Sequence, residues 1–405
     1  MNKKSILFGA SLMSAAAAFA YVDITSDVTW TEMPDVGDGS GFYIFSPAGG
    51  SVTVNVDFES TSENPLPLFQ IASDGWASQG RDVVNFNADS YVKTRLEVGN
   101  FNSADSSTGE MNVASGVSLA IEGFASVGST NDSHSSDKRF AINLGKNSAM
   151  STTSYFDVNK NGTLTIENGA KLNVGTTLAL RTNGIINANG AEIYVQSLST
   201  SEAGGFLNLN NSVMNITGGD FSNHANINVL SSSEFVFSGG RAFFNRADGS
   251  VKISSGNTLN VRRDNAETGN DSYFCNYGKL IIGASTSAEL TDAALYVANF
   301  VDDGNAGIIA LDFSSISESL NNITGIAVSA SNGLSIDSTL FQYTLNGTDY
   351  KTFSLESEVK DGDLSLYAWV QDSSIFYTYS IPEPSTCAAF FGALALAFAA
   401  FRRKR

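Results

Sequence analysis

The stretch DVNKNG, which begins at Asp157, is the part of the chain best spaced for metal chemistry. Asp157, Asn159 and Asn161 place side-chain oxygens at alternate positions before a glycine, as a Ca²⁺-binding loop does. The closing carboxylate of such a loop belongs at the twelfth position, where this chain has Asn168, and Glu167 comes one place early. We expect a strand to follow instead of a helix. The sequence therefore favours the corner of a β-coil over a weak Ca²⁺ site.

Groups suited to acid–base catalysis are few and scattered. The densest charged clusters are Arg262-Arg263-Asp264 and Asp302-Asp303, and the two histidines, His134 and His224, lie in polar stretches typical of turns. Polysaccharide lyases and glycosidases need carboxylates gathered with a base or a metal. The chain also lacks the G-x-S-x-G, H-E-x-x-H and G-x-x-x-x-G-K motifs. We therefore expect no catalytic residue, no metal and no cofactor, with a polysaccharide-active enzyme as the alternative.

The middle of the chain contains a repeat of short stretches in which apolar and polar residues alternate, and the elements that this repeat forms must position the polar groups described above. Its six copies are separated by 22, 21, 20, 24 and 29 residues and begin at Gly162, Gly184, Gly205, Ala225, Gly249 and Gly278. In the first copy, Leu164 and Ile166 alternate with polar residues, a turn follows, and Leu172 and Val174 form a second alternating pair. Alternation with a period of two indicates strands that bury one face.

This period predicts an all-β fold in which successive coils stack. Short strands repeated about every 20 to 24 residues are typical of a β-solenoid, and we expect a right-handed parallel β-helix. One coil cannot bury its apolar face alone, whereas stacked coils form a continuous core. From Gly162 to Val297 the pattern resembles the passenger-type repeats of autotransporter-like adhesins. An antiparallel sandwich or meander would show similar alternation and is the alternative fold.

The stretches on either side of the repeat complete the expected organisation. Residues 21–150 read as an N-terminal β region with early coils, 151–300 as the β-solenoid repeats, and 301–380 as a β-rich C-terminal cap. In the cap, Asn346-Gly347 and Asp361-Gly362 predict hairpin turns.

The N-terminus has the pattern of a secretory signal peptide. Lys3 and Lys4 precede an apolar run, and Ala18 and Ala20 satisfy the small-x-small rule of a signal peptidase site. Residues 1–20 are therefore predicted to be removed, which leaves Tyr21 as the mature start.

The C-terminus has the pattern of a stop-transfer segment. Residues Cys387 to Phe401 carry no charge, and a basic stop follows at Arg402, Arg403, Lys404 and Arg405. As a helix this segment would be about 22 Å long, a little short for a hydrocarbon core of about 30 Å. Basic residues would hold the tip on the cytoplasmic side.

The prolines just before this segment make the pattern specific. Pro382-Glu383-Pro384, an apolar segment and an Arg-rich tip, within residues 381–405, resemble the PEP-CTERM sorting signal of Gram-negative bacteria. The resemblance implies a transmembrane helix, recognition by an exosortase, which is a membrane protease that removes the tail, and an association with exopolysaccharide. Cys387 departs from this pattern, and the sequence offers no explanation for it.

The charge of the chain limits the classes of partner that it can bind, and its cysteine content limits the disulfides that it can form. The whole chain has a net charge of −18, and residues 21–381, without the six terminal basic residues and Glu383, hold 17 basic and 40 acidic residues. A net charge of about −23 opposes binding to nucleic acid and anionic lipid. Cys275 is the only cysteine in this body, so no internal disulfide is expected.

The combined prediction is an exported structural or adhesive protein of the cell surface or extracellular matrix. Its expected partners are an exosortase-like protease, surface polysaccharide or neighbouring surface proteins, and, in transit, the inner membrane.

Overall fold

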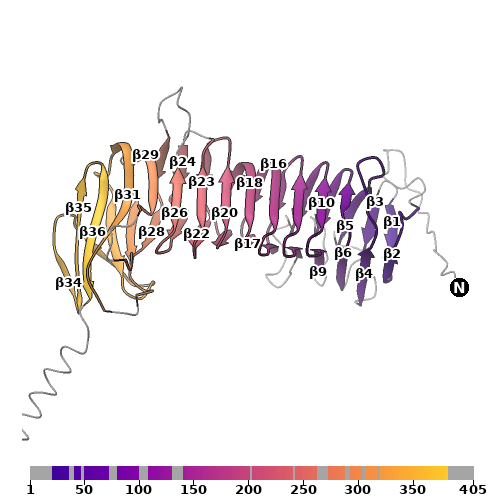
Figure 1. The fold of residues 1–405 in the computed structure, drawn as a ribbon, viewed down its shortest axis with the longest axis horizontal. Helices are drawn as coiled ribbons and strands as arrows, with labels where there is room; N and C mark the ends of the chain where they lie inside the picture. The colour runs from indigo at the N-terminus through magenta and orange to yellow at the C-terminus, as the bar shows by residue number, and fades with distance from the viewer. Residues whose placement is uncertain are drawn as a thin grey trace, which may run out of the picture.

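A computed structural model describes residues 21–35, 41–46, 50–72, 80–99, 108–129, 140–200, 203–239, 242–261, 272–287, 292–302, 304, 307–316 and 319–381. These residues form an elongated body of β-strands with no helix among them (Figure 1). Within the same residues, no segment qualifies as a membrane-spanning helix. Several predictions fall outside the described residues: the signal peptide with Ala18 and Ala20, the sorting signal from Pro382 to Arg405, His134, Arg262–Asp264 and Asp303.

The repeat forms parallel strands that pair in register from one coil to the next. Leu164 pairs with Ile186, and Ile186 pairs with Leu207 on its other side. Paired residues in the following coils are Ile227, Val251 and Leu280, so the offsets equal the spacings of the sequence repeat. The β-helix predicted from the repeat is thus confirmed. The antiparallel sandwich is wrong for this region, because strands that share an apolar face run parallel.

One face of each coil belongs to a single sheet of 14 strands. Its parallel members are β2 (Val28–Trp30), β4 (Ser51–Val56), β6 (Arg81–Phe86), β9 (Thr108–Val113), β12 (Phe140–Leu144), β15 (Gly162–Ile166), β17 (Ile185–Asn189), β19 (Phe206–Asn210), β22 (Asn226–Leu230), β25 (Ser250–Ile253), β28 (Lys279–Gly283), β30 (Ile308–Asp312) and β32 (Leu340–Thr344). We call this the first sheet.

The rest of each coil belongs to a second sheet of 22 strands, which contains two parallel stacks. The stack that follows the first sheet along the chain contains β7 (Ser90–Val92), β10 (Ser118–Ile121), β13 (Ala149–Thr152), β20 (Val213–Ile216), β23 (Glu234–Phe237) and β26 (Thr258–Val261). The other stack contains β1 (Tyr21–Ile24), β3 (Gly41–Ile44), β5 (Leu68–Ile71), β8 (Arg95–Val98), β11 (Phe124–Val127), β14 (Phe156–Val158), β21 (Phe221–Asn223), β24 (Ala242–Asn245) and β27 (Tyr273–Asn276). Four long strands continue through both stacks: β16 (Lys171–Leu180), β18 (Glu192–Ser199), β29 (Leu295–Val301) and β31 (Leu320–Leu334).

Antiparallel strands cover the C-terminal end of the stack. They are β33 (Tyr350–Phe353), β34 (Val359–Asp361), β35 (Leu364–Gln371) and β36 (Ser374–Ile381). Gly347 and Gly362 have positive φ, as hairpin turns at these points require. Parallel pairing itself runs from β1 to β32, so coils occupy residues on both sides of the predicted 151–300 region.

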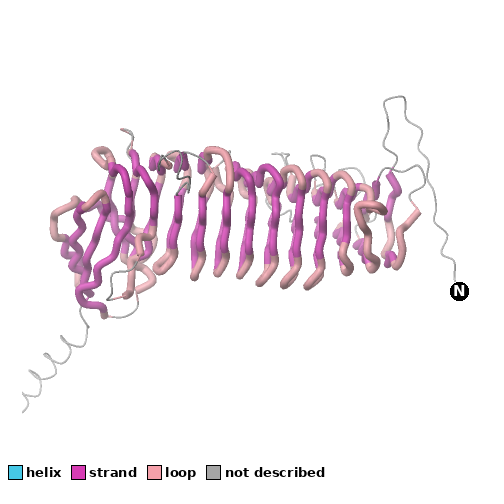
Figure 2. Tube along the Cα trace, turned by 45° about the horizontal axis from the view of Figure 1, so that its top comes forward, coloured by secondary structure: helices cyan, strands magenta, loops and turns pink. Residues whose placement is uncertain are grey.

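A single core runs the length of the body between these faces. Phe243, Phe274 and Phe300 stack through three successive coils, with ring centroids 4.9 and 5.7 Å apart. Burial of each such side chain contributes about 1.5–3 kcal/mol. Figure 2 shows the strands of successive coils lying side by side along the body. Buried residues alternate along these strands with partly exposed ones, and the strands pair in register, so each coil presents its outward-facing side chains beside those of its neighbours.

Candidate functional site

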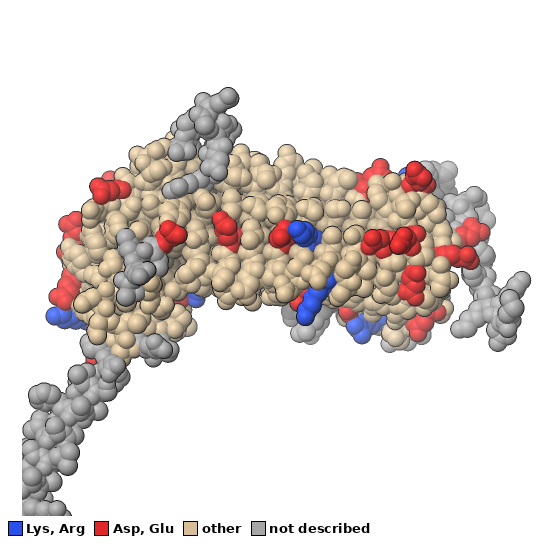
Figure 3. All heavy atoms as spheres, in the orientation of Figure 1, with Lys and Arg blue, Asp and Glu red and all other residues tan. Residues whose placement is uncertain are grey.

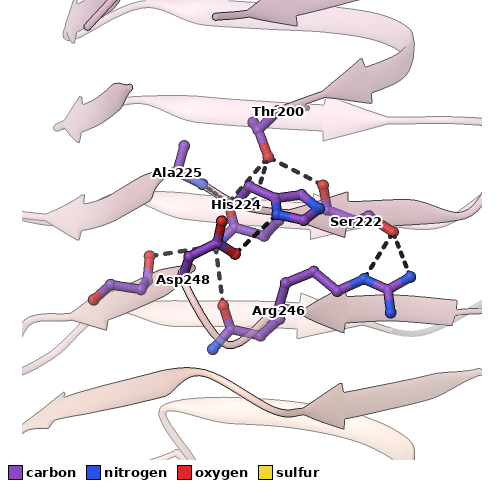
Figure 4. A network of polar contacts seen from close by, with 9 residues as sticks. Thr200, Ser222, His224, Ala225, Arg246 and Asp248 are labelled. Carbon is purple, nitrogen blue, oxygen red and sulfur yellow. Dashed lines mark hydrogen bonds and ion pairs between the residues drawn. The ribbon is translucent and has the colours of Figure 1, made fainter. Parts of the chain in front are cut away.

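A polar cluster lies at the corner between the second and first sheets, where β21 ends. In β21, Phe221 and Asn223 are buried, and Ser222 points outward between them. His224 follows on the outside of the corner, and Arg246 and Asp248 come from the same corner of the next coil (Figure 4). Two adjacent corners therefore supply a hydroxyl, an imidazole, a guanidinium and a carboxylate.

The cluster is joined by two separate contacts. His224 Nδ1 lies 2.8 Å from Asp248 Oδ1. Arg246 donates through Nη2 and Nε to Ser222 Oγ at 2.9 and 3.3 Å (Figure 4). Its guanidinium also lies 4.6 Å from the ring centroid of Phe244.

This arrangement differs from that of a hydrolytic triad. In a triad the serine hydroxyl is hydrogen-bonded to the imidazole that removes its proton. Here the hydroxyl oxygen of Ser222 accepts from Arg246 instead. The His224 and Asp248 side chains are 30% and 48% exposed, so their pairing contributes about 0–1 kcal/mol when the imidazole is protonated. The cluster joins two neighbouring corners and offers a polar contact surface.

A buried ladder of polar side chains lies behind this cluster. Asn223 Nδ2 donates to Asn245 Oδ1 at 3.0 Å, and Asn245 Nδ2 donates to Asn276 Oδ1 at 2.9 Å. Thr200 Oγ1 lies 3.3 Å from Asn223 Oδ1 at the start of the ladder. All four side chains are almost fully buried. Hydrogen bonds between adjacent coils satisfy these groups, which would otherwise destabilise the core.

A second polar series lies on the outer surface of the first sheet. Paired strands place asparagines above one another, and we call them the outer asparagine column: Asn55, Asn85, Asn112, Asn143, Asn187, Asn208 and Asn228. Each Nδ2 in a run donates to the Oδ1 of the preceding asparagine, at 2.8 to 2.9 Å. Thr165 interrupts the column between Asn143 and Asn187.

The residues of the Ca²⁺ candidate lie at a coil corner. Asp157 is in β14, 3.9 Å from Arg181, and burial raises the pKa of its carboxyl more than Arg181 lowers it. Asn159 is buried, and its carbonyl accepts from the N–H of Gly162 at 2.9 Å. The carbonyl of Asn161 accepts from the chain at Phe140, at 3.1 Å. These backbone hydrogen bonds close the corner at Asn159 and join it through Asn161 to the preceding coil, which contains Phe140.

Asp302, from the second predicted charge cluster, is buried and accepts hydrogen bonds from the next coil. Its Oδ2 accepts from the N–H of Ser338 at 2.6 Å, and its Oδ1 accepts from Ser335 Oγ at 3.3 Å. Burial raises the pKa of Asp302, but these hydrogen bonds outweigh it and the net pKa is lowered. The carboxylate therefore links the corner after β29 to Ser335 and Ser338 of the next coil.

A further charged cluster joins the outer surface of the first sheet to the C-terminal hairpin. Lys252 Nζ donates to Asp312 Oδ2 at 2.8 Å, and Lys279 Nζ lies 3.0 Å from the ring centroid of Tyr350 in β33. Asp312 is buried, which raises its pKa, but hydrogen bonds from Lys252 and Ser314 lower it further than burial raises it.

Sequence reasoning missed these inter-coil pairs, although their spacing carried a signal. Asp248 follows His224 by 24 residues, which is the offset between the paired residues Asn226 and Ser250. Asn187, Asn208 and Asn228 likewise occupy one position of the aligned repeats. Aligning the copies residue by residue would have placed both sets in contact.

No family model and no curated protein matches the chain. The features that bear on its function are the fold, the polar side chains that the coils align, and the patterns at the two ends of the sequence.

Proposed function

We propose that this chain is an exported structural or adhesive protein of the cell surface or extracellular matrix, without enzymatic activity. The observation that carries the proposal is the long stack of coils, which forms an elongated body (Figure 1). Paired strands repeat outward-facing polar side chains along this body. Such stacks create extended binding surfaces from one repeated unit. Surface polysaccharide or neighbouring surface proteins are the proposed partners.

The ends of the sequence support export. Residues 1–20 have the pattern of a signal peptide, and Pro382 to Arg405 resemble a PEP-CTERM sorting signal. In this proposal the chain halts in the inner membrane at Cys387–Phe401 and an exosortase-like protease cuts near Pro382–Thr386. The body then reaches the surface. The signal peptide, the membrane-spanning sorting helix and the right-handed sense of the coil stay predictions from the sequence.

A polysaccharide-active enzyme is the competing proposal. It would need an acid, a base and a bound sugar in one place. The carboxylate of Asp302 accepts a hydrogen bond from the N–H of Ser338, and the hydroxyl of Ser222 accepts one from Arg246. These contacts weaken the case for either group as a catalyst.

Intact-mass analysis of the protein recovered from the surface of its native host tests the proposal. The expected mature chain starts at Tyr21 and lacks Arg402 to Arg405. Changing Pro382-Glu383-Pro384 to alanines should retain the tail and hold the protein in the inner membrane. The control Ser380→Ala lies outside both the motif and the predicted cleavage stretch and should be processed normally. Surface protein that still carries Arg402 to Arg405 would show that the tail is a permanent anchor.

A further inference from the structure

Three neighbouring strands of the first sheet, β17, β19 and β22, share an uncharged outer surface. We call it the amide platform and define it by Asn187, Asn189, Phe206, Asn208, Asn210 and Asn228. Asn187 and Asn189 pair with Asn208 and Asn210, and Asn208 pairs with Asn228. The asparagines are half-buried and lie on the outward side of strands whose other residues are in the core.

Hydrogen bonds between coils orient three amides of the platform, those of Asn187, Asn208 and Asn228. Asn208 Nδ2 donates to Asn187 Oδ1 at 2.9 Å, and Asn228 Nδ2 donates to Asn208 Oδ1 at 2.8 Å. A carboxamide has two N–H donors and an oxygen with two acceptor positions. Each inter-coil bond uses one donor and one acceptor position, so Asn208 keeps one of each for a ligand. A pre-oriented donor and acceptor lose little entropy when a ligand binds.

Phe206 adds an apolar contact beside these amides. It is 41% exposed and lies two residues before Asn208, on the same side of β19. A single exposed aromatic residue is ordinary on a protein surface. A sugar ring, however, has hydroxyl groups at its edge and an apolar face. The ordered amides can form hydrogen bonds with the hydroxyl groups, and the ring of Phe206 beside them can stack on the apolar face.

The charges around the platform favour a neutral ligand. Its six residues carry no formal charge, and the body as a whole is strongly acidic, which opposes an acidic chain. Lys252 continues the column after Asn228, but its ammonium is bonded to the carboxylate of Asp312.

We propose that the amide platform binds a neutral, extended polysaccharide chain that lies along the long axis of the body. Adjacent coils are about 4.8 Å apart, close to the length of one sugar unit in an extended β-linked chain. Successive sugars can therefore meet equivalent amides on successive coils. The inference rests on the proposed function for its premise that the body contacts polysaccharide.

Binding of soluble linear neutral glucan and mannan chains to the purified full-length protein tests this assignment, with a linear uronic-acid polymer as the charged comparison. Affinity for a neutral chain should fall at least tenfold in the double variant Phe206→Ala/Asn208→Thr. Thr165 already occupies this column, so a threonine is compatible with the coil. The matched control is Tyr194→Ala/Asn215→Thr, an exposed aromatic residue and an outward-facing paired asparagine on the second sheet, which should bind normally.

The possible results separate the two proposals. Loss of neutral-chain binding in the platform variant alone supports the inference. Equal binding by both double variants, or equal loss in both, overturns it and leaves polysaccharide binding in place. Preference of the native protein for the uronic-acid polymer also overturns it, whereas absence of all glycan binding overturns both proposals. Sedimentation velocity detects self-association, and a dimer that only the platform variant abolishes would assign the surface to a second copy. Asn187→Thr is the substitute if the double variant fails to fold.

Discussion

At the scale of the residue, Ile166 shows how strictly each inward position is specified. Its side chain is fully buried, and the neighbouring coils place Leu144 and Ala188 beside it. Ile166→Asp would put a carboxylate without a partner into this stack, and we expect a loss of several kcal/mol of stability. Thermal unfolding measures the effect. The control is Thr165→Asp, on the outer side of the same strand, which should shift the melting temperature little; an unchanged Ile166→Asp protein would contradict the assigned inward face.

Asp312 makes a second residue-scale prediction, because its folded-state pKa lies below the ordinary value of 3.8. A lowered carboxyl pKa stabilises the fold above the unfolded-state pKa, and this contribution is lost as the pH falls through the folded-state value. Asp312→Asn should therefore be less stable near neutral pH and lose less further stability below about pH 4 than the native protein. Denaturant unfolding across this range measures both effects. If the free energies of unfolding of the two proteins change in parallel with pH, the Lys252–Asp312 contact does not contribute to the pH dependence of stability.

At the scale of the element, the coil corners depend on glycines for two different reasons. Gly128 and Gly256 both have positive φ. A Cβ at Gly128 would lie 2.7 Å from the carbonyl oxygens of Asn159 and Lys160, whereas a Cβ at Gly256 would meet nothing within 4 Å.

Alanine at the two glycines should therefore have unequal effects. Gly256→Ala bears the backbone cost of the left-handed region alone, about 1–2 kcal/mol. Gly128→Ala adds a clash with the next coil and should cost roughly 2–4 kcal/mol. Comparing the two free energies of unfolding isolates the packing contribution, and equal values would mean that the corner relaxes freely.

At the scale of the whole molecule, the stack makes the body long and its charge dispersed. The parallel strands of the first sheet alone extend over about 60 Å. On the face in Figure 3, acidic side chains lie as separate groups along the body and most of the surface is uncharged. Repulsion among these carboxylates is thereby spread over a large surface, which favours solubility.

Solution scattering of residues 21–381 should show this elongation. We expect a skewed pair-distance distribution and a maximum dimension well beyond that of a sphere of equal mass, together with a β-rich circular dichroism spectrum. A compact, symmetric distribution or a helical spectrum would be incompatible with stacked coils.

The sequence by itself determined the core of each coil and the spacing between coils. Alternation with a period of two depends only on the local chain, so Leu164, Ile186 and Leu207 could be assigned to the interior before any contact was known. In the N-terminal coils the offsets are longer, such as 30 residues between Asn55 and Asn85, so the sequence predicts early coils within residues 21–150 but not their spacing.

Only the tertiary structure decided which polar groups meet across coils. The contact between His224 and Asp248 and the burial of Asp302 depend on the register between coils and on the path of each corner. Inward alternation says nothing about either, because a corner can turn a side chain outward or fold it under the next coil. The outer asparagine column lies between these cases: its positions were present in the repeat, but its hydrogen bonds required the coils to stack in register.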